Sequence, residues 1–118
     1  MRGTTLKVTV GRVVHYELGQ QDADAINSRR LDAQAFRARV YDPGSVIERG
    51  EPGRTGHVEH TGNSVSEGDV YPAVVVRVFD PRTTTANLQV LLDGNDQYWA
   101  TSRQEGDGPG FWHWPERV

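Results

Sequence analysis

The chain has 118 residues, of which 36% are hydrophobic and 25% charged, and it contains 13 glycines, 6 prolines and no cysteine. This length fits one domain, and the lack of cysteine excludes disulfides, thiolate metal sites and a cysteine nucleophile. A membrane-spanning helix needs about 18 consecutive apolar residues, whereas the longest apolar run is the four residues 73–76. The first residues lack the apolar region of a secretory signal, so we expect none.

Sixteen acidic and 13 basic residues give the chain a formal net charge of −3. Acidic and basic side chains are interleaved, and the longest basic run is the pair Arg29-Arg30. A protein that binds nucleic acid without sequence preference displays a basic stripe that neutralises phosphates. We therefore expect neither a nucleic acid nor a membrane as the main partner.

Residues 4–18 have the pattern of extended backbone. Apolar and polar residues alternate from Leu6 to Val10, as in a half-buried strand. After Gly11, β-branched and aromatic residues resume at 13–16. This pattern predicts two short strands, or one strand bent at a glycine bulge.

Residues 20–40 contain good helix formers and neither glycine nor proline. One face of a helix is marked by side chains at three- and four-residue spacing, namely Ile26, Arg30, Ala33, Phe36 (or Arg37) and Val40. The flanks are heavily charged, with acidic residues early and arginines late, as the helix dipole favours. The sequence predicts a surface helix that rests on a sheet or on a neighbouring subunit.

Residues 42–69 are rich in glycine and in turn-forming pairs, such as Asp42-Pro43-Gly44 and Gly62-Asn63. Irregular segments of this length are uncommon in small domains and are usually functional or disordered. We expect this segment to be an extended loop, or an arm that orders against a partner.

Residues 71–118 supply the core strands. Residues 73–79, which are apolar except for Arg77, predict a central strand covered on both faces, and 86–92 can pair with it in antiparallel fashion. The segment 93–96 is a hairpin signal, and 98–101 forms the returning strand. The expected fold is therefore mainly β: one domain over 1–118, built as a small antiparallel barrel or sandwich of five to six strands with one inserted helix.

The histidines do not form a recognisable metal motif. His57 and His60 could be metal ligands, but zinc needs three or four ligands and this loop pair supplies two. Both are more typical of solvated or partner-facing side chains, while His15, between Val14 and Tyr16, has the setting of a core histidine. No hydrolase, phosphate-loop or dinucleotide-binding motif is present. We expect no enzyme activity, no cofactor and no metal.

Three tryptophans lie within the last twenty residues, at Trp99, Trp112 and Trp114. On a terminal strand, Trp112 and Trp114 would face the same way. They either plug one end of the barrel or form an exposed apolar patch that a partner covers. The sequence leaves both interpretations open.

Several strings of the chain resemble short proteins of actinobacteria and their tailed phages. These strings are spread along most of the length of the chain and lie at 11–16, 26–30, 56–60, 71–73, 87–96, 99–102 and 112–117. The closing string, Trp-His-Trp-Pro-Glu-Arg at 112–117, is the most specific. The preference for arginine over lysine agrees with an actinobacteriophage genome. The resemblance transfers no catalytic or cofactor-binding residue.

The resemblance implies a phage setting, in which a small β-rich body with an arm suits capsid decoration. The leading hypothesis is a non-enzymatic minor capsid protein that is made in the host cytoplasm. It would form a homo-oligomer on the capsid surface of the virion and stabilise the shell by binding the major capsid protein. The candidate contact residues are Arg29, Arg30, Arg37, Arg39, His57, His60, Trp112 and Trp114. The alternative is a nucleotide-sequestering or regulatory interaction protein made during infection.

Overall fold

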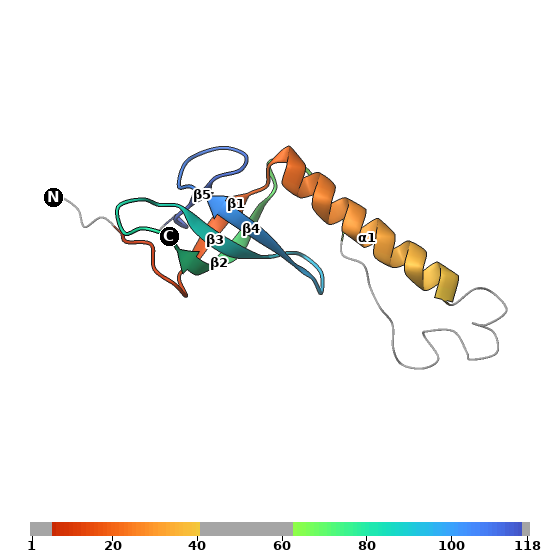
Figure 1. The fold of residues 1–118 in the computed structure, drawn as a ribbon. Coiled ribbons are helices and arrows are strands. Elements are labelled where there is room, and N and C mark those ends of the chain that lie inside the picture. The colour runs from red at the N-terminus through yellow and green to blue at the C-terminus, as the bar shows by residue number, and fades with distance from the viewer. Residues whose placement is uncertain (1–5, 41–62, 117–118) are drawn as a thin grey trace.

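The computed structural model of the chain describes residues 6–40 and 63–116, drawn in colour in Figure 1. In chain order, the elements are β1 (Val13–Glu17), α1 (Gln20–Val40), β2 (Val70–Val78), β3 (Ala86–Leu91), β4 (Gln97–Arg103) and β5 (Trp112–His113). The prediction of a mainly β fold with one inserted helix is confirmed. The helix spans the residues predicted for it.

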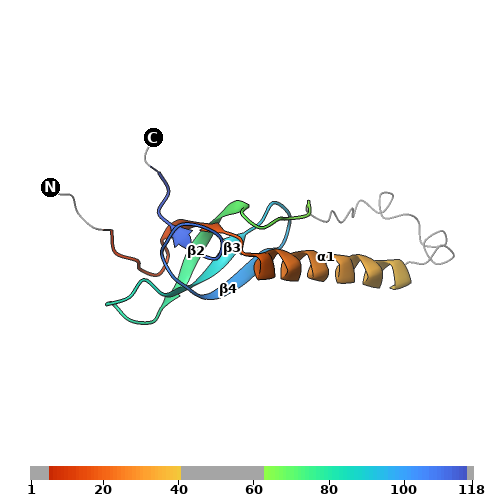
Figure 2. The same ribbon diagram turned by 90° about the horizontal axis from the view of Figure 1, so that it is seen from above.

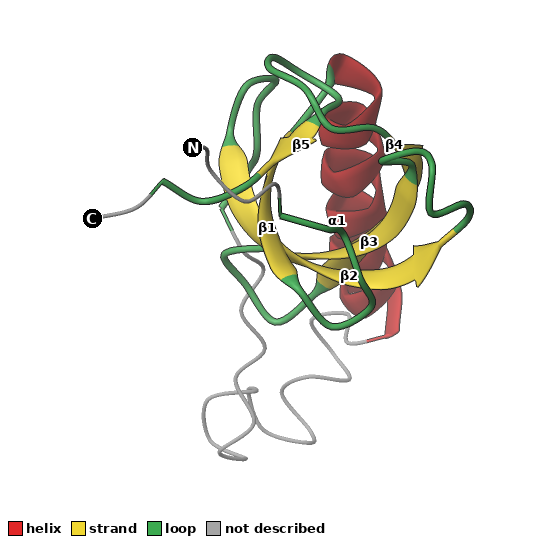
Figure 3. Cartoon of the chain, turned by 90° about the vertical axis from the view of Figure 1, so that its left-hand side faces the viewer, coloured by secondary structure: helices red, strands yellow, loops and turns green. Residues whose placement is uncertain are grey.

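The five strands form one antiparallel sheet in the order β4-β3-β2-β1-β5, and the sheet is strongly curled (Figure 3). Strand pairing does not close it, so the barrel is not confirmed. The two edges nevertheless approach each other just after β4. There the Trp112 amide donates to the Gln104 carbonyl at 3.1 Å, and the Gly106 amide donates to the Trp112 carbonyl at 2.9 Å.

The core lies on the concave face of the sheet. Side chains that alternate along the strands point inward and are fully or almost fully buried: Val14, Tyr16, Ala73, Val75, Ala86, Leu88, Val90, Ala100 and Trp112. The run 73–79 is central in the sheet, as predicted. It is not covered on both faces, because Val76 is 40% exposed and Arg77 is exposed as well.

The first half of α1 packs on the body and the rest extends away from it (Figures 1 and 2). Ala23, Ile26 and Arg30 are buried, whereas Leu31 is 64% exposed and Ala33 is exposed. A 21-residue helix is about 31 Å long. The predicted contact face is confirmed at Ile26 and Arg30 and is wrong at Ala33, and the side chains of Phe36 and Val40 lie outside the described residues.

The N-terminal segment differs from its prediction. Residues 6–10 form no strand, although Val8 is buried. The chain turns at Gly11, whose φ of +95° favours glycine and whose amide donates to the Val75 carbonyl at 2.8 Å. Regular pairing begins only at Val13.

Part of the predicted arm 42–69 belongs to the body. Val65 is buried in the core, and the Leu18 amide donates to the Asp69 carbonyl at 2.8 Å. Residues 42–62, including His57 and His60, lie outside the described residues. In the part of the chain that the structure describes, no helix is long and apolar enough to cross a membrane.

Candidate functional site

A buried polar cluster joins the start of α1 to the sheet. The Asp22 carboxylate, 2% exposed, accepts hydrogen bonds from the hydroxyls of Tyr16 and Tyr98, the latter at 2.8 Å. Arg103 Nη2 donates to Asp22 Oδ1 at 2.7 Å, and Arg103 Nε donates to the Tyr16 hydroxyl, also at 2.7 Å. Asp22 lies in the first turn of the helix and accepts the Gly19 amide at 2.8 Å, as an N3 residue does in a capping box.

Burial alone would raise the pKa of the Asp22 carboxyl. The hydrogen bonds from Tyr16, Gly19 and Tyr98, together with the positive charge of Arg103, outweigh burial and lower this pKa below its ordinary value. Burial and the neighbouring Asp22 carboxylate raise the pKa of the Tyr16 hydroxyl well above its ordinary value. The cluster therefore holds an ionised aspartate, two neutral tyrosines and a charged arginine. Its hydrogen bonds fasten the helix to the sheet.

A β-bulge directs Arg103 into this cluster. The β3–β4 register shifts by one residue between the pairs Leu88↔Ala100 and Ala86↔Arg103. The extra residue is accommodated at Ser102, whose φ is +56°, and the Ser102 amide donates to the buried Asn87 side chain at 2.8 Å. Without the extra residue, simple alternation from the inward-facing Ala100 would point Arg103 outward.

A second cluster fastens α1 about two turns further along. Arg30 Nε and Nη2 donate to the two carboxylate oxygens of Asp96 at 2.9 and 2.8 Å, a paired geometry that is strong for guanidinium and carboxylate. Arg29 Nη2 also reaches Asp96, at 2.9 Å. The hydrogen bonds from Arg30 lower the pKa of Asp96 to about 2, against the opposing effect of burial. Asn27 adds a two-bond clamp on the backbone of Val65, at 2.8 and 3.0 Å.

These clusters determine where the predicted contact arginines lie. Arg30 is buried and bonded to Asp96 and to the Asn63 carbonyl, so it is part of the fold's internal support. Arg29 is at the surface and shares Asp96. The side chains of Arg37 and Arg39 lie outside the described part of the chain.

The closing aromatic string contributes to the core. Trp112 is fully buried, and its indole N–H donates to the Thr84 carbonyl at 3.0 Å. Trp114 is half-buried and packs edge-to-face on Trp112, with ring centroids 5.4 Å apart. The sequence left open whether this string fills the core or forms an exposed patch, and for Trp112 the structure shows the core position. A side chain with no exposed surface is not available to a partner on the folded body.

The convex face of the sheet carries Trp99, an exposed aromatic residue that is not among the predicted contact residues. Cross-strand pairing aligns four residues in one row over four strands: Val13, Val74, Gln89 and Trp99. Val13 is 51% exposed and Trp99 is 59% exposed. Val70 and Leu91 are exposed on the same face. We call this set of six residues the outer apolar face.

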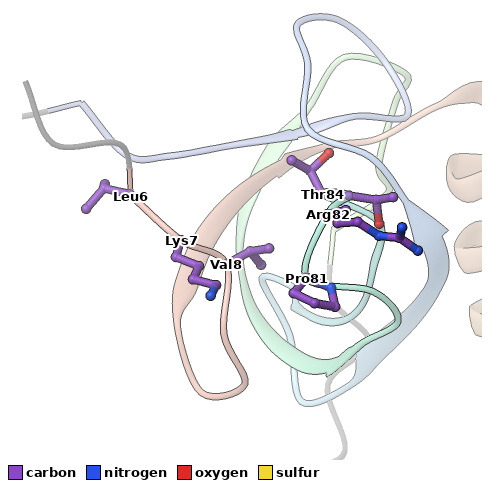
Figure 4. Close-up of a pocket in the computed structure, with 7 residues that line it drawn as sticks. Leu6, Lys7, Val8, Pro81, Arg82 and Thr84 are labelled. Atoms are coloured by element: carbon purple, nitrogen blue, oxygen red, sulfur yellow. The ribbon is translucent and has the colours of Figure 1, made fainter.

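A cavity of about 360 Å³ lies at one end of the sheet, between residues 6–8 and the loop that joins β2 to β3 (Figure 4). Leu6, Val8 and Pro81 supply apolar walls, and Lys7 and Arg82 supply positive charge. The charge of Arg82 is partly neutralised by Asp80, because Arg82 Nη2 lies 3.0 Å from Asp80 Oδ2.

Comparison with known proteins identifies no relative. No family model, no curated protein and no solved structure matches this chain.

Proposed function

We propose that this protein is a non-enzymatic structural protein of a tailed-phage virion, which decorates the capsid shell by binding the major capsid protein. The observation that supports this proposal best is the outer apolar face. Its row of Val13, Val74, Gln89 and Trp99 is fixed by strand pairing and exposed at both ends. A tryptophan exposed on a rigid sheet is the kind of side chain that dominates binding energy in protein interfaces.

The energetics of such a contact suit a protein present in many copies. Each square ångström of apolar surface removed from water contributes about 25 cal/mol, and association itself opposes binding by several kcal/mol. A face the size of the outer apolar face therefore gives modest affinity per copy. Contacts between neighbouring copies on a shell would raise the effective affinity through multivalency.

The extended end of α1 supplies a second contact at a distance from the first. Two hydrogen-bonded clusters, around Asp22 and around Asp96, hold the first half of the helix. The helix then continues beyond the body with Leu31 exposed. A body that binds through its sheet and reaches sideways with a helix can bridge two subunits of a lattice. The sequence places Arg37 and Arg39 on that end, where an acidic capsid surface would be complementary.

The choice of partner comes from the resemblance of the quoted strings to proteins of actinobacteria and their phages. Its direct test is quantitative mass spectrometry of gradient-purified virions of a phage that encodes this chain. The proposal predicts tens to hundreds of copies per particle. A handful of copies would move the protein to the neck or tail, and its absence from virions would overturn the proposal.

The cavity of Figure 4 supports the second candidate function, binding of a small anionic ligand such as a nucleotide. Its volume falls at the lower end of the range of small-molecule sites, and Lys7 and Arg82 offer positive charge. Native mass spectrometry of the freshly purified protein tests this function. A bound ligand that Lys7→Ala removes would favour it, whereas an empty cavity with no affinity for nucleotides would exclude it.

A further inference from the structure

Two histidines from opposite ends of the chain lie side by side on the convex face. His15 of β1 and His113 of β5 are directly opposite each other in the antiparallel pair, with ring centroids 5.7 Å apart and ring planes at 88°. Both are half-buried. The neighbouring pair, Tyr16 and Trp112, fills the concave face, so alternation directs both imidazoles outward. His15 is therefore not the core histidine that the sequence suggests.

The spacing of these rings fits coordination of one metal ion. Zinc binds imidazole nitrogen at about 2 Å, which puts the ion about 3 Å from each ring centre, so two rings at a near-tetrahedral angle have their centres about 5 Å apart. The observed 5.7 Å is slightly wider than this separation, and a small side-chain movement brings the rings to it. The edge-to-face arrangement requires one ring to rotate so that both nitrogens point to the same ion. The χ2 angle of histidine has a broad energy profile, so this rotation is inexpensive.

We propose that His15 and His113 form a two-histidine site for a transition-metal dication such as Zn²⁺, Ni²⁺ or Cu²⁺. Neutral imidazole is a favoured ligand of these metals. Among the described residues, no group of three or more His, Asp or Glu side chains could hold a metal, so the protein supplies two ligands, fewer than the three or four of a stable zinc site. Water molecules fill the remaining positions on the solvent side, and we expect weaker binding than at such a site. The site is independent of the proposed virion function.

A metal at this site would reinforce the pairing of the shortest strand. β5 has two residues and pairs with β1 through His15↔His113 and Tyr16↔Trp112. An ion held by both histidines cross-links these strands. The unfolded chain has no preformed site, because 98 positions separate the two residues in sequence, so binding stabilises the native state.

The experiment titrates Zn²⁺, and separately Ni²⁺, into the full chain prepared without an affinity tag. We expect one saturable site by calorimetry and a melting temperature that rises with metal and returns to its starting value with EDTA. Because one imidazole cannot chelate, His15→Gln and His113→Gln should each weaken metal binding by about tenfold or more. Each variant is first melted without metal to show that it is folded.

The matched control is the double variant His57→Gln/His60→Gln, which removes the other two histidines of the chain. It should keep the affinity and the thermal shift of the wild type. NMR of the histidine rings in the wild-type protein gives a readout that needs no variant, because Zn²⁺ should shift the resonances of His15 and His113. The proposal is overturned if millimolar metal does not bind, if the affinity survives His15→Gln and His113→Gln, or if it is lost in the control.

Discussion

Asp22 and Arg103 are 81 residues apart in the chain, yet their side chains meet at 2.7 Å between Oδ1 and Nη2. This ion pair links the first turn of α1 to the last residue of β4. Tyr16 and Tyr98 complete it from β1 and from the other end of β4. The buried cluster thereby fixes the direction in which the helix leaves the sheet.

Asp22→Asn should destabilise the protein by about 2–4 kcal/mol, because it leaves the Arg103 charge without its buried partner. Urea unfolding followed by circular dichroism measures this loss. Asp24→Asn is the matched control, since Asp24 is exposed in the same turn and bonds only Gln20 in the described residues. The control should change the free energy of unfolding by less than about 0.5 kcal/mol. Equal effects of the two substitutions would contradict the role assigned to Asp22.

Asp96 should make stability depend on pH in the acid range. Its pKa is about 2 in the folded protein, against an ordinary value of 3.8. A carboxyl with a lowered pKa contributes stability above the unfolded value, and this contribution is lost as the pH falls from about 4 through 2. The shift corresponds to about 2 kcal/mol. The difference in unfolding free energy between wild type and Asp96→Asn, measured from pH 5 to pH 2, should shrink by about that amount. A difference that stays constant over this range would argue against the Arg30–Asp96 pair.

The two halves of α1 should respond differently to the same kind of truncation. Ile26→Ala removes a fully buried side chain and should cost about 2–5 kcal/mol. Leu31 lies about one turn further along, at an exposed position. The substitution Leu31→Ala should therefore change the free energy of unfolding by less than about 0.5 kcal/mol. Chemical denaturation of both variants gives the comparison. A large loss at Leu31 would mean that the helix packs further along its length than described.

The two tryptophans should differ in how much they contribute to folding stability. Trp112→Ala empties a fully buried site and should cost about 3–5 kcal/mol of folding free energy. Trp99→Ala removes a largely exposed ring and should leave the melting temperature within a few degrees of wild type. Thermal unfolding of both variants tests the assignment of core and surface. Comparable losses would show that Trp99 also supports the fold.

Local patterns in the sequence predicted the elements but not how they contact one another. Helix 20–40 and the strands after residue 70 follow from periodicity and turn residues, which are local signals. The buried cluster depends on residues far apart in the chain, and Arg103 reaches it only because the bulge at Ser102 shifts the alternation of β4. The hydrogen bond from the Gly19 amide to Asp22 had no clear sequence signal, because the capping-box pattern has Ser or Thr at the first position and Glu or Gln at the fourth.

Two predictions are wrong for the same physical reason. The apolar neighbours of His15 predict a core position, although strict alternation with Val14 and Tyr16 directs it to the opposite face. The largely apolar segment 73–79 predicts a strand covered on both faces. The helix packs along one end of the curled sheet instead, so the described residues leave the convex face open (Figure 3). Composition indicates how apolar a strand is, whereas its covering depends on tertiary structure.

The most direct test of the central proposal is binding of the purified protein to phage shells that lack it, measured by co-sedimentation. Wild type should bind in saturable, stoichiometric amounts. Trp99→Ala should weaken binding by about tenfold or more, as expected for an aromatic residue central to an interface. Gln97→Ala, an exposed position on the same strand and face, should bind as wild type does. Shells that bind none of these proteins, or that bind Trp99→Ala as tightly as wild type, would contradict the proposal that the outer apolar face decorates the capsid.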